Sequence, residues 1–235
     1  FIPLYADNDA APHDKSYFIK VGILGGTIPP VHTLVIHVCT VGIATLDVPE
    51  PFRRANITCQ SVTGYDRRAA VAYAHQWAYG RNPDFYDYEE IGGDCTNFAS
   101  QCLYAGTGVM NFDPVYGWFY RDPNDKAPAW TGVEYFFDFI TRQTPSPGPF
   151  GISTTLSELE PGDFVQFRFN KDVFGHTPVV VEIGRPATLQ NTLIAAHSYD
   201  ADWRPLSTYY FQEIRFLHIQ GAYRELGEEP LLPGM

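Results

Sequence analysis

Cys95 is the residue with the clearest capacity for chemistry. It lies in the segment Gly92-Gly93-Asp94-Cys95-Thr96-Asn97-Phe98, where two glycines allow a tight backbone approach and Asp94 can cap a helix. Cys95 would then occupy the first helical turn, where unpaired N–H groups and the helix dipole favour the thiolate. A thiolate is a good nucleophile, and the same N–H groups can receive an oxyanion. The segment indicates a catalytic cysteine, although a buried cysteine that starts a helix explains the local features equally well.

A nucleophilic cysteine needs a base, and His176 is the best placed of the seven histidines. It stands in Gly175-His176-Thr177-Pro178, at the mouth of an expected strand, from which an imidazole can reach a helix N-terminus. His197 ends the next expected strand. If the two strands are antiparallel neighbours, His197 lies beside His176 and can fix its tautomer, as the third member of a triad does. Asp200 is the alternative for that role, and a histidine on a surface turn is the alternative interpretation of His176.

Three residues are candidates for substrate binding: Asp94, Tyr116 and Trp118. The last two belong to the aromatic run Tyr116-Gly117-Trp118-Phe119-Tyr120, and aromatic rings often line a substrate groove because they offer apolar area at low entropic cost. The same rings could instead cover the core. Cys102 lies two helical turns after Cys95 on the same face, which is typical of a core thiol.

The elements that must position these residues follow from periodicity. Apolar residues at helical spacing predict a first helix from Asp66 to Ala78, a second from Asp94 to Gly106, and a third that opens with the capping box Thr131-x-x-Glu134 and runs to Ile140. Period-two patterns predict strands at 164–169, 178–183, 192–197 and 213–219. Helices followed by an antiparallel meander predict an α+β domain.

A change of composition near residue 64 predicts three parts. They are a β-rich or disordered extension at 1–63, a catalytic domain at 64–222 and a tail at 223–235. With 235 residues and 45% hydrophobic side chains, the chain has material for a real core. The net charge of −11 argues against nucleic acid and against anionic membranes as partners.

Neither a transmembrane segment nor a signal peptide is expected. The best apolar run, Val31 to Val48, is interrupted by polar residues and is shorter than the roughly 20 residues that a spanning helix needs. Of the four cysteines, Cys39 and Cys59 could pair, but the sequence cannot decide it. No CxxC occurs, so a structural zinc site is not expected. A metal site at His176, His197 and Asp200 lacks support from a paired-histidine motif, and no cofactor is predicted.

Several motifs together resemble those of the bacterial putative amidase domain family. They include Gly93-Asp94-Cys95-Thr96-Asn97-Phe98-Ala99-Ser100-Gln101, Gly117-Trp118, Trp130-Thr131-Gly132-Val133-Glu134, Leu159-Glu160-Pro161-Gly162-Asp163, Gly175-His176 and Ala196-His197-Ser198-Tyr199-Asp200. The resemblance extends from about Tyr65 to Ile219. This family is related to the NlpC-type and CHAP-type cell-wall hydrolases, which are papain-like.

The resemblance implies a papain-like, NlpC-like fold with N-terminal helices packed on a C-terminal antiparallel sheet. It also implies Cys95 as nucleophile, His176 as base and His197 as the orienting group of a cysteine amidase or peptidase that forms a thioester. The implied substrate is a peptide or a peptidoglycan fragment. The sequence leaves the location of the protein unknown, with the cell envelope or the outside of the cell favoured. The alternative function is a non-catalytic binding module of the same fold. The oligomeric state is not predicted.

Overall fold

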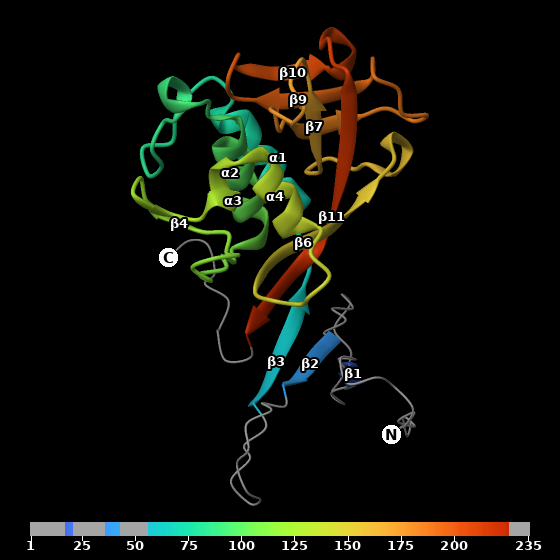
Figure 1. Ribbon diagram of the computed structural model, residues 1–235. Coiled ribbons are helices and arrows are strands. Elements are labelled where there is room, and N and C mark those ends of the chain that lie inside the picture. The colour runs from blue at the N-terminus through green and yellow to red at the C-terminus, as the bar shows by residue number, and fades with distance from the viewer. Residues whose placement is uncertain (1–16, 21–35, 43–55, 226–235) are drawn as a thin grey trace, which may run out of the picture.

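The computed structural model describes residues 17–20, 36–42 and 56–225 of the chain (Figure 1). Within these residues, four α-helices precede most of a long antiparallel sheet. The helices are α1 (Arg67–Trp77), α2 (Cys95–Thr107), α3 (Pro128–Thr131) and α4 (Val133–Ile140), and the 3-10 helices are η1 (Glu89–Ile91), η2 (Leu156–Glu158) and η3 (Leu206–Thr208). The α+β prediction is confirmed by this arrangement.

The strands form one curled sheet and one small ribbon. They are β1 (Tyr17–Lys20), β2 (Ile36–Gly42), β3 (Asn56–Thr63), β4 (Tyr120–Asp122), β5 (Asp125–Lys126), β6 (Gly148–Thr154), β7 (Phe164–Arg168), β8 (Val179–Ile183), β9 (Thr192–Ala196), β10 (Ala201–Pro205) and β11 (Glu213–Glu225). The large sheet has the order β1-β2-β3-β11-β7-β8-β9-β10, and β6 also pairs with β11. All of these pairings are antiparallel, and β4 pairs with β5 alone.

Alternation along the central strands explains why helices can cover one face while a second core forms on the other. Side chains of successive strand residues point to opposite faces. On β7, Phe164 faces the helices and Val165 faces the second core, and on β8 Val179 and Val180 divide in the same way. These four side chains are fully buried. Because both faces are covered, the strands contain almost continuous apolar runs.

Helix α2 is the central helix of the domain, because most of its residues are buried. Phe98 and Leu103 pack into the main core together with Trp118 and Trp130. Helix α1 packs beside it and buries Ala70 and Ala74. In α1 the predicted cap is confirmed, because Asp66 Oδ1 accepts a hydrogen bond of 3.0 Å from the N–H of Ala69.

Two predicted helix boundaries differ from the structure. Helix α2 does not end at Gly106 but continues to Thr107, and Gly108 is its left-handed cap with φ of 60°. Gly106 is required for close packing instead, since a Cβ there would lie 2.3 Å from the ring of Tyr65. The predicted capping box at Thr131 is also wrong. Thr131 ends α3, and Gly132 precedes α4 without any side-chain cap.

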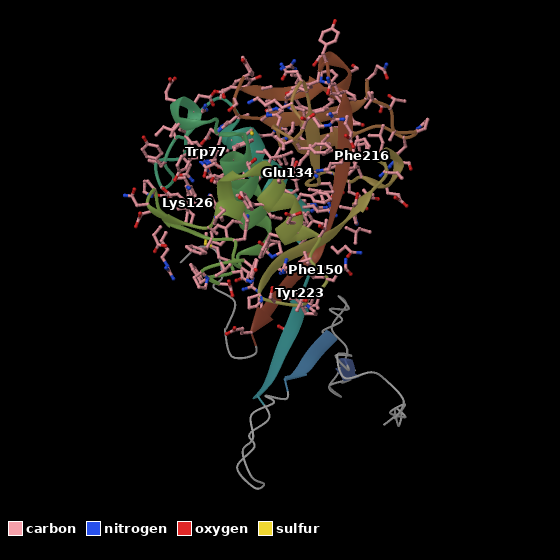
Figure 2. The ribbon with its side chains drawn as sticks, viewed as in Figure 1. Trp77, Lys126, Glu134, Phe150, Phe216 and Tyr223 are labelled. Carbon is pink, nitrogen blue, oxygen red and sulfur yellow. The ribbon has the colours of Figure 1, made fainter. Side chains whose placement is uncertain are left out.

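Strand β11 passes through the predicted boundary between 222 and 223. It pairs with β7 at one end, with β6 along its middle and with β3 at Ala222 to Glu225. Phe150 of β6 stacks on Tyr223 of β11 with ring centroids 4.3 Å apart, toward the lower end of β11 in Figure 2. Residues 56–63 and 223–225 therefore belong to the same sheet as the predicted catalytic domain.

Strands β1 and β2 continue the sheet beyond β3 (Figure 1). The register places Cys39 of β2 opposite Cys59 of β3. This position is compatible with the pairing of the two cysteines that the sequence left open. Residues 1–16, 21–35, 43–55 and 226–235 lie outside the described residues. So does most of the apolar run Val31 to Val48. Among the helices that the structure describes, none has the length and apolar character to cross a bilayer.

Candidate active site

Cys95 is the first residue of α2, as the sequence predicted. Gly92 and Gly93 precede it with φ of 109° and 99°, values that favour glycine, so the predicted tight approach is present. A Cβ on Gly93 would lie 3.1 Å from the hydroxyl of Ser198. The turn thus brings the chain after β9 against the start of α2, and it places Cys95 in an interior position with 7% of its surface exposed.

The surroundings of the Cys95 sulfur oppose the thiolate that the helix position predicted. Burial raises the pKa of the Cys95 thiol, and hydrogen bonds from the backbone of Thr177 and from Thr96 lower it only in part. The Thr96 hydroxyl lies 3.8 Å from the sulfur. At a buried position the cost of desolvating the thiolate exceeds the stabilisation that a few hydrogen-bond donors provide. Burial at this position accordingly favours the thiol form of Cys95 over the thiolate.

His176 lies just before β8 and forms an isolated bridge with Phe167 of β7. Its backbone carbonyl accepts a hydrogen bond of 3.1 Å from the N–H of Phe167. The ring is 5% exposed and is packed between aromatic rings, with Phe167 at 6.2 Å and Tyr209 at 5.6 Å between centroids. Burial, followed by the nearby charge of Arg204, lowers the pKa of His176 from 6.5 to about 4. The imidazole is therefore neutral near pH 7 and able to accept a proton.

A pair of threonine hydroxyls joins the two segments. Thr96 Oγ1 and Thr177 Oγ1 are 3.1 Å apart, and both residues are fully buried. Gln166 of β7 donates a further hydrogen bond of 3.1 Å to Thr177 Oγ1. Because Thr96 follows Cys95 and Thr177 follows His176 in the chain, this link joins the start of α2 to the segment that carries His176. The sequence prediction assigned no role to either threonine.

His197 does not orient His176 as the sequence predicted. Its Nδ1 lies 2.5 Å from Asp94 Oδ2, and its Nε2 donates to the carbonyl oxygen of Trp77 at 2.8 Å. Both ring nitrogens therefore have partners other than His176. The ring also stacks on Phe98 with centroids 4.0 Å apart. His197 instead ties the end of β9 to the C-terminal end of α1, where Figure 2 labels Trp77, and to the start of α2.

Asp94 acts within this buried pair rather than as a helix cap or a substrate contact. Its side chain makes no capping hydrogen bond to α2, contrary to the prediction. Oδ1 accepts hydrogen bonds from the N–H of Tyr88 at 2.9 Å and from Asn97 Nδ2 at 2.8 Å. Asp94 and His197 are each 1% exposed. A buried carboxylate facing an imidazole in this way fixes the start of α2 and hence the position of Cys95.

Asp200, the alternative third member, is engaged elsewhere. Arg81 donates to both of its carboxylate oxygens, at 2.9 and 3.0 Å. This fork geometry is the strong form of an arginine–carboxylate pair. The same arginine also lies near Asp87 and Glu89. Asp200 therefore belongs to a charged cluster at the surface, and no hydrogen bond joins it to His176 in the described part of the chain.

The two aromatic candidates for substrate binding are not in this site. Trp118 is fully buried, and its indole N–H donates to the Ser100 hydroxyl at 3.0 Å. The prediction that it lines a substrate groove is wrong, because its ring packs in the core beside Trp130. Tyr116 is 82% exposed and borders a separate hollow near Asn111 and the end of α4.

Tyr209 is a site residue that sequence reasoning missed. It packs on His176 and on Phe167, with ring centroids 5.6 and 4.7 Å away. Its hydroxyl is buried and has no hydrogen-bond partner within the described residues. Burial raises the pKa of Tyr209, the nearby guanidinium of Arg204 lowers it in part, and the proximity of Cys95 raises it further. An aromatic residue just after η3 gives no local signal of such a role, since only the sheet's curl brings it to His176.

A pocket of about 490 Å³ opens beside the imidazole. It is lined by Phe169, Gly175, His176, Ser198, Tyr199, Arg204, Thr208, Tyr209 and Tyr210. The exposed rings of Tyr199 and Tyr210, 89% and 96% accessible, stand at its rim. Among the residues that the structure describes, no three His, Cys, Asp or Glu side chains come together as metal ligands would.

Comparison with known proteins places these residues within a recognised domain. The family described as "Putative amidase domain" matches residues 64–219. The chain is 32% identical over 164 residues to "Uncharacterized protein YhbB" of Bacillus subtilis (strain 168), a match that covers 66% of this chain and 50% of that protein. It is 26% identical over 117 residues to "Uncharacterized protein YjcM" of the same organism, which covers 50% of this chain and 26% of that protein. The chain thus spans half or less of these relatives. No solved structure is a significant match.

Proposed function

Because the chain belongs to the family described as "Putative amidase domain", we propose that it hydrolyses amide bonds with Cys95 as nucleophile and His176 as base. The observation that carries this proposal is the buried link between Thr96 and Thr177, 3.1 Å between hydroxyl oxygens. It joins the helix start that carries Cys95 to the segment that carries His176, whose neutral imidazole lines a pocket. A thiol and a neutral imidazole in this arrangement supply a nucleophile and its general base.

The raised pKa of Cys95 and the lowered pKa of His176 indicate how the reaction begins. Both groups are neutral at rest, so the proton moves from sulfur to imidazole as the sulfur attacks the carbonyl carbon. The oxyanion then forms beside the N–H groups at the start of α2. His176 returns the proton to the leaving amine as the C–N bond breaks, which leaves a thioester on Cys95. Water attacks the thioester with His176 as base, and the acid leaves as the thiol is restored.

The orienting role in this proposal differs from the one expected for His197. Packing between Phe167 and Tyr209 holds the imidazole of His176 by ring contacts. The Asp94–His197 pair acts on the other partner, because it fixes the start of the helix that carries Cys95. We therefore propose that His197 is a positioning residue for the nucleophile.

The papain-like, NlpC-like fold is part of the same proposal. It is supported by the order of elements, in which a helix opens with the cysteine and antiparallel strands follow, with the histidine at the start of the second central strand. Peptide bonds of peptidoglycan are the proposed substrate. That step rests on the motif resemblance to NlpC-type and CHAP-type hydrolases, since fold alone does not specify a substrate.

The test is hydrolysis of purified peptidoglycan stem peptides by the whole chain, followed as new amino groups. Cys95→Ala is expected to reduce the rate by at least a thousandfold. Cys102→Ala is the matched control, because Cys102 is a fully buried thiol of the same helix that packs in the core. Equal activity of Cys95→Ala and Cys102→Ala, both folded, would sink the cysteine mechanism.

A non-catalytic binding module is the second candidate. The 7% exposure of Cys95 and the raised pKa of its thiol favour it, since a protonated interior thiol is unreactive by itself. Stem peptides that bind without being cleaved, together with Cys95 alkylation no faster than that of a free thiol at pH 7, would support this function.

A further inference from the structure

The pocket beside His176 contains an arginine that has no acidic partner. Arg204 donates from Nε to the Thr208 hydroxyl at 2.8 Å and from Nη2 to the Thr208 carbonyl at 3.4 Å. No carboxylate of the described residues forms an ion pair with it. The arginines Arg67, Arg81 and Arg215, in contrast, all pair with acids. Its Nη1 remains available to a ligand.

The guanidinium of Arg204 is held at the candidate base. Its Cζ lies 4.0 Å from the centroid of the Tyr209 ring, which in turn packs on His176. Arg204 and His176 line the same pocket, and the positive charge of Arg204 contributes to the low pKa of His176. The cation therefore faces the same pocket as the candidate base, with the Tyr209 ring between them.

The buried phenol of Tyr209 is a second donor in this place. Its hydroxyl makes no hydrogen bond of ordinary geometry to the described residues, and the charged donor near it is the guanidinium of Arg204. A buried polar group without a well-formed hydrogen bond destabilises the protein. A ligand oxygen that enters the pocket would offset this cost. The guanidinium can only donate hydrogen bonds, and the phenol can donate one through its O–H group. The phenol oxygen is the one acceptor that these two groups offer.

The net charge of the chain strengthens the argument that Arg204 marks a site for an anionic group. With a net charge of −11, the protein as a whole repels anions. An anionic group can then be held only where a specific cation faces it. Guanidinium matches a carboxylate in shape as well as charge, since two parallel N–H groups can meet its two oxygens.

We propose that Arg204 binds a carboxylate of the substrate beside the scissile amide bond, so that the preferred substrates are peptides with a free carboxylate near that bond. This inference rests on the proposed function. It names the substrate class of the same site. The rim tyrosines Tyr199 and Tyr210 supply contact area for the rest of the peptide.

Two alkylating reagents of nearly equal size test the proposal without a known substrate. Iodoacetate carries a carboxylate and iodoacetamide is neutral, and both form a thioether with the sulfur of Cys95 and release iodide. Rate constants at Cys95 in the whole chain are measured by mass spectrometry at pH 7, with N-acetylcysteine as the free-thiol reference. The ratio of iodoacetate to iodoacetamide rates reports the attraction of a carboxylate to the site, independently of thiol reactivity.

We expect the ratio at Cys95 to exceed the reference ratio by about tenfold, which corresponds to about 1.4 kcal/mol. Arg204→Gln should return it to the reference value. Arg68→Gln, the same change at an exposed arginine of α1, should leave it raised. A ratio equal to the reference in the unchanged protein, or one that Arg204→Gln does not alter, would overturn the proposal.

Failure of the cysteine mechanism gives a different result. If Cys95 reacts with neither reagent, the nucleophile assignment fails, and equilibrium binding decides the carboxylate site. N-acetyl-alanyl-alanine should then bind the whole chain more tightly than its C-terminal amide, and Arg204→Gln should remove the difference. Equal binding of the acid and the amide by the unchanged chain would overturn the carboxylate site.

Discussion

The low pKa of His176 makes a quantitative prediction about stability. The imidazole is 5% exposed in the native chain and its pKa is about 4, whereas the ordinary value is 6.5. Between these two pH values the unfolded chain takes up a proton that the native chain does not. Since protonation then favours the unfolded state, the contribution of His176 to stability is complete above pH 6.5 and is lost as the pH falls to about 4. The loss amounts to about 3 kcal/mol, at about 1.36 kcal/mol for each unit of pKa difference.

His176→Phe isolates this contribution, because a phenyl ring can occupy the space beside Phe167 and Tyr209 and does not titrate. The free energy of unfolding is measured by urea denaturation of both proteins at pH 7, 6, 5 and 4. Carboxylates and the other histidines titrate in both proteins, so their effects cancel in the difference. The unchanged protein should lose about 3 kcal/mol more than His176→Phe between pH 7 and pH 4. Equal losses in the two proteins would refute the buried, neutral imidazole and with it the proposed resting state of the base.

Two further predictions separate residues that the sequence could not rank. Asp94→Asn should lower the free energy of unfolding by about 3 kcal/mol, because it breaks a buried pair with His197. Asp200→Asn changes a partly exposed pair and should lower it by about 1 kcal/mol or less. Urea denaturation measures both variants, and the reverse ranking would contradict the positioning role of Asp94. Trp118→Ala should lower the free energy of unfolding by about 3–5 kcal/mol, because its ring fills the core. Tyr116→Ala should change the free energy of unfolding by no more than about 0.5 kcal/mol, and it should leave peptide hydrolysis unchanged. A large loss of activity with Tyr116→Ala would show that the substrate reaches the hollow beside this ring.

Local chemistry made parts of the fold predictable. The cap at Asp66 and the start of α2 at Cys95 were predicted correctly, because a helix N-terminus depends on a few neighbouring residues. Period-two patterns located β7, β8 and β9 to within one residue at each end. Three predictions about helix ends failed, at Gly106, at Thr131 and in the capping role of Asp94, and they concern residues that tertiary partners engage or displace.

Partners far apart in the sequence were beyond such rules. Asp94 and His197 are 103 positions apart, and Thr96 and Thr177 are 81 apart. Each contact forms only because α2 packs against the strands of the curled sheet. The expectation that His197 orients His176 assumed that neighbouring strands place their ends together. It failed because the two rings have different neighbours. His197 stacks on Phe98, whereas His176 packs against Phe167 and Tyr209.

The sequence by itself determined the α+β class, the position of Cys95 at a helix start and the place of His176 before a central strand. These depend on residue types within a few positions of each other. Only the tertiary structure decided that burial raises the pKa of the Cys95 thiol, that His197 pairs with Asp94, and that Arg204 and Tyr209 line the pocket beside His176. The physical reason is that desolvation and charge act through space, and the distances through space are set by how the helices and the curled sheet pack.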